Sequence, residues 1–277
     1  MKILPAIKKS VFFNKLLFTF LKGSLNRNRK FKDLHLGDTC YIFGNGESIK
    51  SMDLAIFNDK VSIGCNNLFL HKDFNKLDCR YYQIVAPFIF LPYFKYYGKL
   101  QRNHISAVYK KKIKDFKNVT FFTSILNKFT IFAPNIYYEH HFGVTTSDLK
   151  NCELDGTFSF LSGATDAMIG LAIYMGFKKA VLVGVDYTFS ESVSHHFYEK
   201  GKGRGKNNEA YNKAFFEDIK TTIDVLTITL NGSKSDTLEF ANYTDYTKNP
   251  ERYQENIECI DKEDLDKLDN MGLYKIW

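Results

Sequence analysis

Apolar runs typical of buried strands alternate along this chain with segments typical of helices. The clearest strand, KAVLVGVDY (residues 179–187), is an almost uninterrupted apolar run that ends beside an acid, as in strands covered on both faces. The clearest helix, SGATDAMIGLAIYMGF (162–177), has small and apolar residues all round and should be buried. This alternation predicts an α/β fold with a Rossmann-like, mostly parallel sheet flanked by helices.

Shorter segments fill in the rest of this pattern. Further strands are predicted at TCYIFG (39–44), VSIGCNN (61–67), RYYQIVA (80–86), NVTFFTS (118–124), KFTIFAP (128–134) and SDTLEFANYTD (235–245). Helices are predicted at SMDLAIFN (51–58), at 93–116 with a heavily basic exposed face, and at 207–226. The sequence therefore predicts a main domain over residues 37–248.

The two ends of the chain are predicted to be appendages, residues 1–36 and 249–277. In the first, the apolar run VFFNKLLFTFL (11–21) has near-helical spacing and precedes a basic cluster at 26–32. The run is too short and too interrupted to span a bilayer. A basic amphipathic helix at an anionic membrane surface and a helix packed on the domain or on another subunit both stay open. The second is predicted to be a helical lid or interaction element.

The charge and the cysteines narrow the class of partner. The net charge of +7 suits nucleotides, anionic lipid or nucleic acid, and no aromatic-basic motif supports nucleic acid. The five cysteines form no CxxC pair and no metal-ligand spacing with histidine. A reduced, intracellular protein is expected, with no cysteine in catalysis and no metal site.

A glycine turn follows the first strand of the main domain. Gly44, Asn45 and Gly46 come directly after the apolar run, and Ser48 opens the next segment. Glycine lets a backbone approach a ligand closely, and a helix N-terminus offers free N–H groups to an anion. The segment therefore predicts a site for a phosphate-bearing ligand, although a strand-to-helix turn needs glycine for geometry alone. It matches neither the dinucleotide fingerprint nor the P-loop.

Polar residues also follow two other predicted elements. Asn66 and Asn67 end the second strand, where open α/β sheets bind ligands, and an amide can read a pyrimidine edge or a ribose hydroxyl. A turn closed by Asx hydrogen bonds is the alternative. Ser162 and Gly163 precede the buried helix, where the serine is an N-cap or a ligand contact.

The strand ending at 187 leads into a histidine loop. Asp186 could bind a hydroxyl, a metal or a general-base histidine, or be structural. Two adjacent histidines and Tyr198 then precede GKGRGK (201–206), a cationic loop that either closes over a phosphate or carboxylate or is simply solvated. Histidine is the side chain best suited to take a proton from a sugar hydroxyl near neutral pH.

The succession GNG, CNN, SG before a small-residue helix, GVDY and a later histidine resembles the bacterial sialyltransferases that cap lipooligosaccharides. The HFY loop with GKG and the later LEFANYTDY (238–246) also resemble polysaccharide-cluster proteins similar to the archaeal hydroxymethylpterin pyrophosphokinase. The resemblance covers roughly residues 41–246. It implies a nucleotide-sugar-binding catalytic domain over 37–248.

The resemblance implies an inverting, metal-independent glycosyltransferase that requires no cofactor. Its donor would be a CMP-activated acidic keto sugar, such as sialic acid, another nonulosonate or Kdo. Its acceptor would be a hydroxyl of a capsule, lipooligosaccharide or O-antigen glycan. The protein would be cytoplasmic, with peripheral contact to the cytoplasmic face of the inner membrane. A homo-oligomer is left open, and the sugar, acceptor and linkage are not specified.

Site roles carried over from the resemblance follow its motifs. His196 would be the general base. Donor nucleotide and phosphate would lie against Gly44, Asn45, Gly46, Ser48, Asn66, Asn67, Ser162, Gly163, Asp186 and Tyr187. Two departures matter: Glu47 replaces a proline, and no arginine precedes the SG pair. A phosphate or carboxylate clamp would then fall to Tyr198, Lys202 and Arg204.

Two other function classes stay open. One is a Mg²⁺-dependent pyrophosphokinase-like or other nucleotide-diphosphate-sugar enzyme, which would need carboxylates to hold the metal. The other is a non-catalytic nucleotide-binding protein, in which His196 is an ordinary loop histidine.

Overall fold

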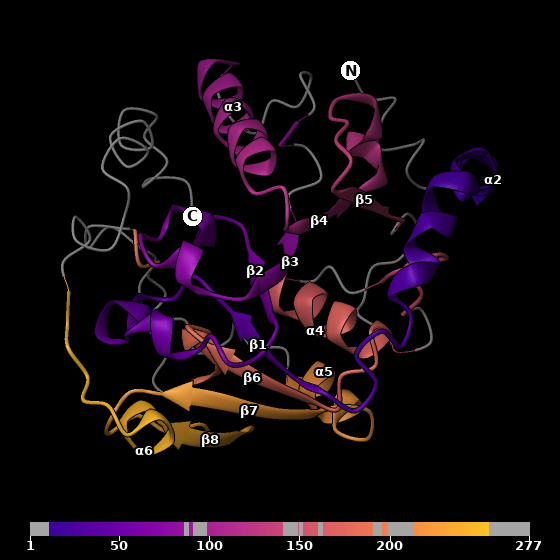
Figure 1. Cartoon of the computed structure of the whole chain (residues 1–277). Helices are drawn as coiled ribbons and strands as arrows, with labels where there is room; N and C mark the ends of the chain where they lie inside the picture. The colour runs from indigo at the N-terminus through magenta and orange to yellow at the C-terminus, as the bar shows by residue number, and fades with distance from the viewer. Residues whose placement is uncertain are drawn as a thin grey trace.

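A single sheet of eight parallel strands forms the centre of the molecule (Figure 1). The structure, a computed structural model, describes residues 11–85, 89–90, 99–140, 149, 152–159, 163–190, 196–198 and 213–254. The strands are β1 (Thr39–Phe43), β2 (Ser62–Cys65), β3 (Cys79–Ile84), β4 (Thr120–Ser124), β5 (Ile136–Glu139), β6 (Lys179–Val183), β7 (Asp224–Thr229) and β8 (Glu239–Asn242). This sheet confirms the predicted α/β, Rossmann-like fold class.

Both faces of the sheet are covered. Successive side chains of a strand point to opposite faces, so in β1 Cys40 and Ile42 join one core layer while Tyr41 and Phe43 join the other. The first layer contains α4 (Ala164–Tyr174) and α5 (Lys213–Ile219), and the second contains α3 (Lys99–Asp115), α6 (Tyr243–Thr247) and short 3₁₀ helices. Covering both faces explains why the strands are apolar runs.

The strand order places the ligand crevice. From one edge the order is β5-β4-β3-β2-β1-β6-β7-β8, so the direction of winding reverses between β1 and β6. In open α/β sheets ligands bind outside the carboxyl ends of the strands at such a switch point. The segments that follow β1 and β6 are therefore the expected location of a site.

One predicted element is wrong near the β5 edge. The KFTIFAP segment is not a strand: η6 (Ile125–Phe129) and a turn occupy it, and the strand is Ile136–Glu139. The Ser124 side chain accepts from the Leu126 amide and starts the 3₁₀ turn, and Pro134 has no N–H to give to a strand ladder.

Two predicted helices also differ from the structure. The 51–58 segment forms no α-helix; η2 (Glu47–Ser51) and η3 (Leu54–Ile56) lie there, because Asp53 caps a new turn by accepting from the Ala55 amide. The predicted 207–226 helix ends at Ile219, and its last residues belong to β7. The other 3₁₀ helices that the structure describes in full are η1 (Arg27–Phe31), η4 (Leu68–Leu70), η5 (Phe74–Lys76) and η8 (Asp186–Thr188).

The N-terminal helix α2 (Val11–Asn26) packs beside β5. Leu21 and Leu25 are buried in the same core layer as the sheet residues, so the packed-helix alternative describes this part of the predicted 1–36 segment. Within the described residues, no helix is both long and apolar enough to cross a membrane. The predicted domain boundaries are not tested, and residues 249–254 of the predicted C-terminal helix are not helical.

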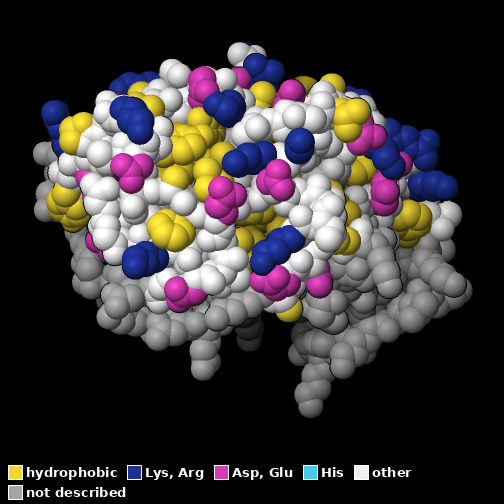
Figure 2. Space-filling model, turned by 90° about the horizontal axis from the view of Figure 1, so that it is seen from below, with side chains coloured by type: hydrophobic (Ala, Val, Ile, Leu, Met, Phe, Trp, Pro, Cys, Tyr) yellow, Lys and Arg dark blue, Asp and Glu magenta, His cyan; other side chains and the backbone are white. Residues whose placement is uncertain are grey.

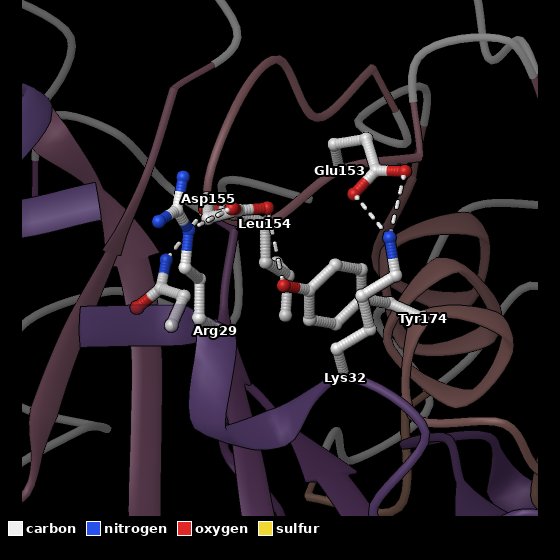
Figure 3. A network of polar contacts seen from close by, with 7 residues as sticks. Arg29, Lys32, Glu153, Leu154, Asp155 and Tyr174 are labelled. Carbon is white, nitrogen blue, oxygen red and sulfur yellow. Dashed lines mark hydrogen bonds and ion pairs between the residues drawn. The ribbon is translucent and has the colours of Figure 1, made fainter. Parts of the chain in front are cut away.

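The predicted basic cluster at 26–32 makes contacts within the molecule (Figure 3). Arg29 pairs with Asp155 at 2.8 Å and Lys32 with Glu153 at 3.4 Å. Asn28, which precedes Arg29 in the chain and is fully buried, donates to the backbone carbonyls of Tyr138 and Leu154. These bonds connect η1 to β5 and to the segment that follows it, so part of the basic cluster stabilises the fold.

Candidate functional site

The glycine turn after β1 is bonded to the segment that follows β6. The Gly44 amide donates to the Val183 carbonyl at 2.8 Å, and the Gly46 amide donates to the Gly184 carbonyl at 2.8 Å. Gly184 has φ of +69°, a left-handed conformation that favours glycine. Backbone hydrogen bonding between β1 and β6 thus continues past the ends of both strands, and it fixes the position of the glycine turn at the switch point of the sheet.

Asp186 fills the space directly against this turn. Its carboxylate accepts from the Ser48 amide at 2.8 Å and from the Ser48 hydroxyl at 2.5 Å. Burial raises the pKa of Asp186 to about 6, against the opposing effect of the two Ser48 bonds; the neighbouring Glu47 adds to the rise and His196 counters it. The two Ser48 donors that the sequence offers to a phosphate are therefore occupied by a carboxylate of the protein.

The histidine segment lies against the same turn. His196 forms an antiparallel bridge with Gly46, and the Phe197 amide donates to the Asn45 carbonyl at 3.0 Å. The His196 ring stacks on Tyr198 with centroids 5.1 Å apart. The fold thus brings together three predicted site residues, the glycine, the aspartate and the histidine, from three separate segments. Tyr198, predicted as a clamp, supports the His196 ring.

Asn45 has a buried acceptor that the described residues leave without a partner. Its Nδ2 donates to the Cys65 carbonyl at 3.1 Å and to the Cys65 sulfur at 3.3 Å, whereas its buried Oδ1 accepts no hydrogen bond from any described residue. An unsatisfied buried acceptor is costly, and the group that relieves it must carry an O–H or N–H. A sugar or base donor fits this atom, and an ionised phosphate oxygen does not.

The two asparagines after β2 differ in their surroundings. Asn66 has φ of +49°, and its carbonyl accepts from the Tyr82 hydroxyl at 2.8 Å. Asn67 Oδ1 accepts from the Tyr109 hydroxyl at 2.9 Å. Both residues are half-buried at the carboxyl edge of the sheet. The Asn67 amide oxygen is thus already engaged, and within the described part of the chain no hydrogen bond to the Asn66 side chain is found.

The other predicted contacts are less defined. Gly163 is the N-cap of α4 and has open space where a Cβ would lie. Tyr187 is half-buried against the core layer of α4. Ser162, Lys202 and Arg204 lie outside the described residues. Among those the structure describes, no three His, Cys, Asp or Glu side chains form a group that could hold a metal ion.

Sequence reasoning missed a partly buried ion pair beside the turn. Lys50 is only 3% exposed, and its ammonium lies 3.2 Å from the Glu47 carboxylate. The carbonyl of Lys50 accepts from the Gln254 amide at 2.8 Å, so the C-terminal segment covers η2. The spacing of the pair, i and i+3, was the available signal. The Glu47 carboxylate thus has a cationic partner within the same 3₁₀ helix.

Replacing Gly46 with alanine should damage both the fold and ligand binding. A Cβ at this position would lie 2.4 Å from the Asp186 carboxyl carbon and equally close to one of its oxygens. Relief requires Asp186 to leave the Ser48 donors, which we expect to cost about 2–4 kcal/mol of unfolding free energy. Urea unfolding measures this loss.

Gly23→Ala is the matched control, because nothing lies within 4 Å of a Cβ there. Its unfolding free energy should be unchanged or slightly raised. Equal stabilities of the two variants would show that Asp186 does not hold the turn.

Comparison with known proteins gives similarity to solved structures alone. No protein-family model matches the sequence, and no curated protein matches it. The structure of the sialyltransferase CstII from Campylobacter jejuni, in complex with the substrate analogue cytidine-5'-monophosphate, is 16% identical with a TM-score of 0.48, over 84% of this chain and 98% of that one.

A second similar structure is the monofunctional alpha-2,3-sialyltransferase Cst-I from the same organism. It is 14% identical with a TM-score of 0.45, over 86% of this chain and 94% of that one. Such low identities and scores carry no argument about function, which has to come from the site residues. The chain is similar to these sialyltransferases in fold.

Proposed function

We propose that the protein is a glycosyltransferase that uses a CMP-activated acidic keto sugar, of the sialic acid, nonulosonate or Kdo type. The observation that carries the proposal is the position of His196, bridged to Gly46 and beside Asp186 at the switch point of the sheet. The order of motifs that resembles the lipooligosaccharide sialyltransferases supports the same reading. The acceptor is a hydroxyl of a capsule, lipooligosaccharide or O-antigen glycan at the cytoplasmic face of the inner membrane.

The proposed step is an inverting displacement. The His196 imidazole takes the proton of the acceptor hydroxyl while that oxygen bonds to the anomeric carbon. The bond between this carbon and the phosphate oxygen breaks, and CMP leaves with the electron pair. At neutral pH Asp186, with a pKa of about 6, is mostly ionised and stabilises the imidazolium that forms. No metal is required in this step, because a monophosphate carries less charge than a diphosphate.

The buried Asn45 Oδ1 limits which group of the nucleotide sugar can contact it, because that group must donate a hydrogen bond. Because Oδ1 is buried and unsatisfied, we propose that it accepts from a hydroxyl of the ribose or of the transferred sugar. This interaction anchors the donor, while the nucleotide lies along Asn66 at the end of β2.

A nucleotide-binding screen tests the donor class. CMP should raise the melting temperature without Mg²⁺, and UDP, GDP and ATP should raise it less. Stabilisation by ATP with Mg²⁺ alone would contradict the CMP-sugar proposal and favour the pyrophosphokinase-like class.

Calorimetry with deoxy analogues then tests Asn45. Removing the hydroxyl that Oδ1 accepts should weaken binding to the wild type about tenfold. The same removal should change binding to Asn45→Ala little, because the partner atom is already gone. Equal losses in both proteins for every analogue would exclude a hydroxyl contact at this atom.

A further inference from the structure

Three phenylalanines are exposed along the β5 side of the molecule. Phe20 on α2 is 79% exposed, Phe129 at the end of η6 is 67% exposed, and Phe132 in the following turn is 80% exposed. Scattered single apolar side chains at a surface are ordinary, but a group of large ones indicates an interaction site. These three have no role in the proposed transfer.

Contacts between their elements show that the phenylalanines belong to one region. Lys128, next to Phe129, donates a hydrogen bond to the Ser24 hydroxyl of α2. Ser24 lies four residues after Phe20, so the two share one flank of the helix. The Tyr138 hydroxyl of β5 donates to the Ile131 carbonyl at 2.7 Å, which fixes the turn that carries Phe132. In Figure 1, α2, β5 and α3 lie along the same side of the molecule.

This side is also strongly basic. Residues 110–135 contain six lysines (110, 111, 112, 114, 117 and 128) and one acid, Asp115. Lys110, Lys114 and Lys117 line an open cavity of about 610 Å³ together with Phe132. None of these three lysines forms an ion pair with any residue that the structure describes. We call the surface formed by these residues the β5-side face: Phe20, Phe129, Phe132, Lys110, Lys114 and Lys117.

Two other parts of the described surface differ in charge from the β5-side face. Arg29 and Lys32 already pair with carboxylates. Around β7 and β8, at the other edge of the sheet, Figure 2 shows Lys and Arg side chains interspersed with Asp and Glu. Neither of these two parts carries the excess of lysines over acids found on the β5-side face.

We propose that the β5-side face docks on an anionic lipid surface. Phenylalanine rings enter the boundary between headgroups and acyl chains, and lysines contact lipid phosphates, which is how amphipathic surfaces bind membranes. The inference deepens the membrane part of the proposed function and rests on it. It places the contact on the folded domain, in a region separate from the basic cluster at 26–32, in which Arg29 and Lys32 pair with carboxylates.

Flotation of the full chain with vesicles tests the face. Wild type should float with vesicles of phosphatidylcholine and phosphatidylglycerol, should not float with phosphatidylcholine alone, and should release as salt rises. The triple change Lys110→Glu, Lys114→Glu and Lys117→Glu should lower the bound fraction at least tenfold, as should Phe129→Ser with Phe132→Ser. Each variant should melt as the wild type does, because all five side chains lie at the surface.

Arg29→Ala with Lys32→Ala is the matched control, since it removes two basic residues that already have carboxylate partners. Its flotation should equal that of wild type. Loss of flotation in this control with retention in the face variants would overturn the inference, and would move the contact to the N-terminal segment. Face variants that float as well as wild type would also overturn it. So would a wild-type protein that binds RNA or a second copy of itself and loses that binding with the same substitutions.

Failure of the wild type to float would remove both the inference and the membrane part of the proposed function. CMP binding by the same protein, measured without lipid, separates that outcome from failure of the transferase proposal.

Discussion

Replacing His196 with alanine should lower kcat for glycosyl transfer by about 10²–10⁴-fold, the usual contribution of a positioned general base. Its backbone bridge to Gly46 uses main-chain atoms only, so the turn keeps its shape in the variant. The Kd of CMP should therefore stay within about twofold of the wild-type value. The rate of transfer is measured from the product formed, and the Kd of CMP is measured by calorimetry.

The pH profile separates a base from a merely structural histidine. In the wild type kcat/KM should fall as pH is lowered through about 6, because protonation of Asp186 removes the charge that stabilises the imidazolium. The His196→Ala variant forms no imidazolium, so its residual activity should lack this part of the fall.

His196→Asn is the control for polarity, because it keeps a polar side chain that cannot take the proton. It should be as slow as the alanine variant. Substantial turnover in either variant would mean that His196 has a structural role, and the non-catalytic reading of this loop would then be favoured.

The sequence predicted the fold class because the sheet is covered on both faces, which makes its strands apolar runs. The sequence did not predict β5, because this buried strand ends in a charged residue. The strand IYYE ends in Glu139, and a carboxylate in a short segment looks exposed until its burial is known. The neighbouring KFTIFAP is more apolar, yet Phe129 and Phe132 in it are among the most exposed side chains described. Local hydrophobicity could not separate a buried strand from an exposed turn.

The proximity of Gly46 and Asp186 could be predicted from the sequence, because both follow parallel strands whose carboxyl ends meet at one edge of the sheet. The bridge of His196 to Gly46 could not. The bond from Ser48 to Asp186 joins residues 138 positions apart, so no local pattern could show that the turn's donors are occupied. Pairing of Arg29 with Asp155 likewise depends on tertiary structure.

Glu139 should make stability depend on pH. It is fully buried at the carboxyl end of β5, and Gln83 donates to one of its oxygens at 2.7 Å while the other has no partner among the described residues. Burial raises the pKa of Glu139 to about 8, and the Gln83 bond only partly opposes the rise. The carboxyl is thus mostly neutral in the folded protein at pH 7, whereas it ionises near its ordinary pKa of about 4.5 once the chain unfolds.

The sign of the dependence follows from the raised pKa. The stabilisation that the bound proton provides is complete below the unfolded pKa, and it is lost as pH rises through about 8. Glu139→Gln has no proton to lose and keeps an acceptor for Gln83. Its stability relative to wild type should therefore increase from pH 5 to pH 9, by up to about 4 kcal/mol.

Urea unfolding of both proteins at about pH 5 and about pH 9 measures this change. Glu239→Gln on the opposite edge strand is the matched control, because Glu239 is exposed. Its difference from wild type should be nearly the same at both pH values. Parallel stability curves for wild type and Glu139→Gln would show that the Glu139 carboxyl is ionised in the folded protein. Its unpartnered oxygen would then have to be hydrated, and the β5 end would be open to solvent rather than sealed.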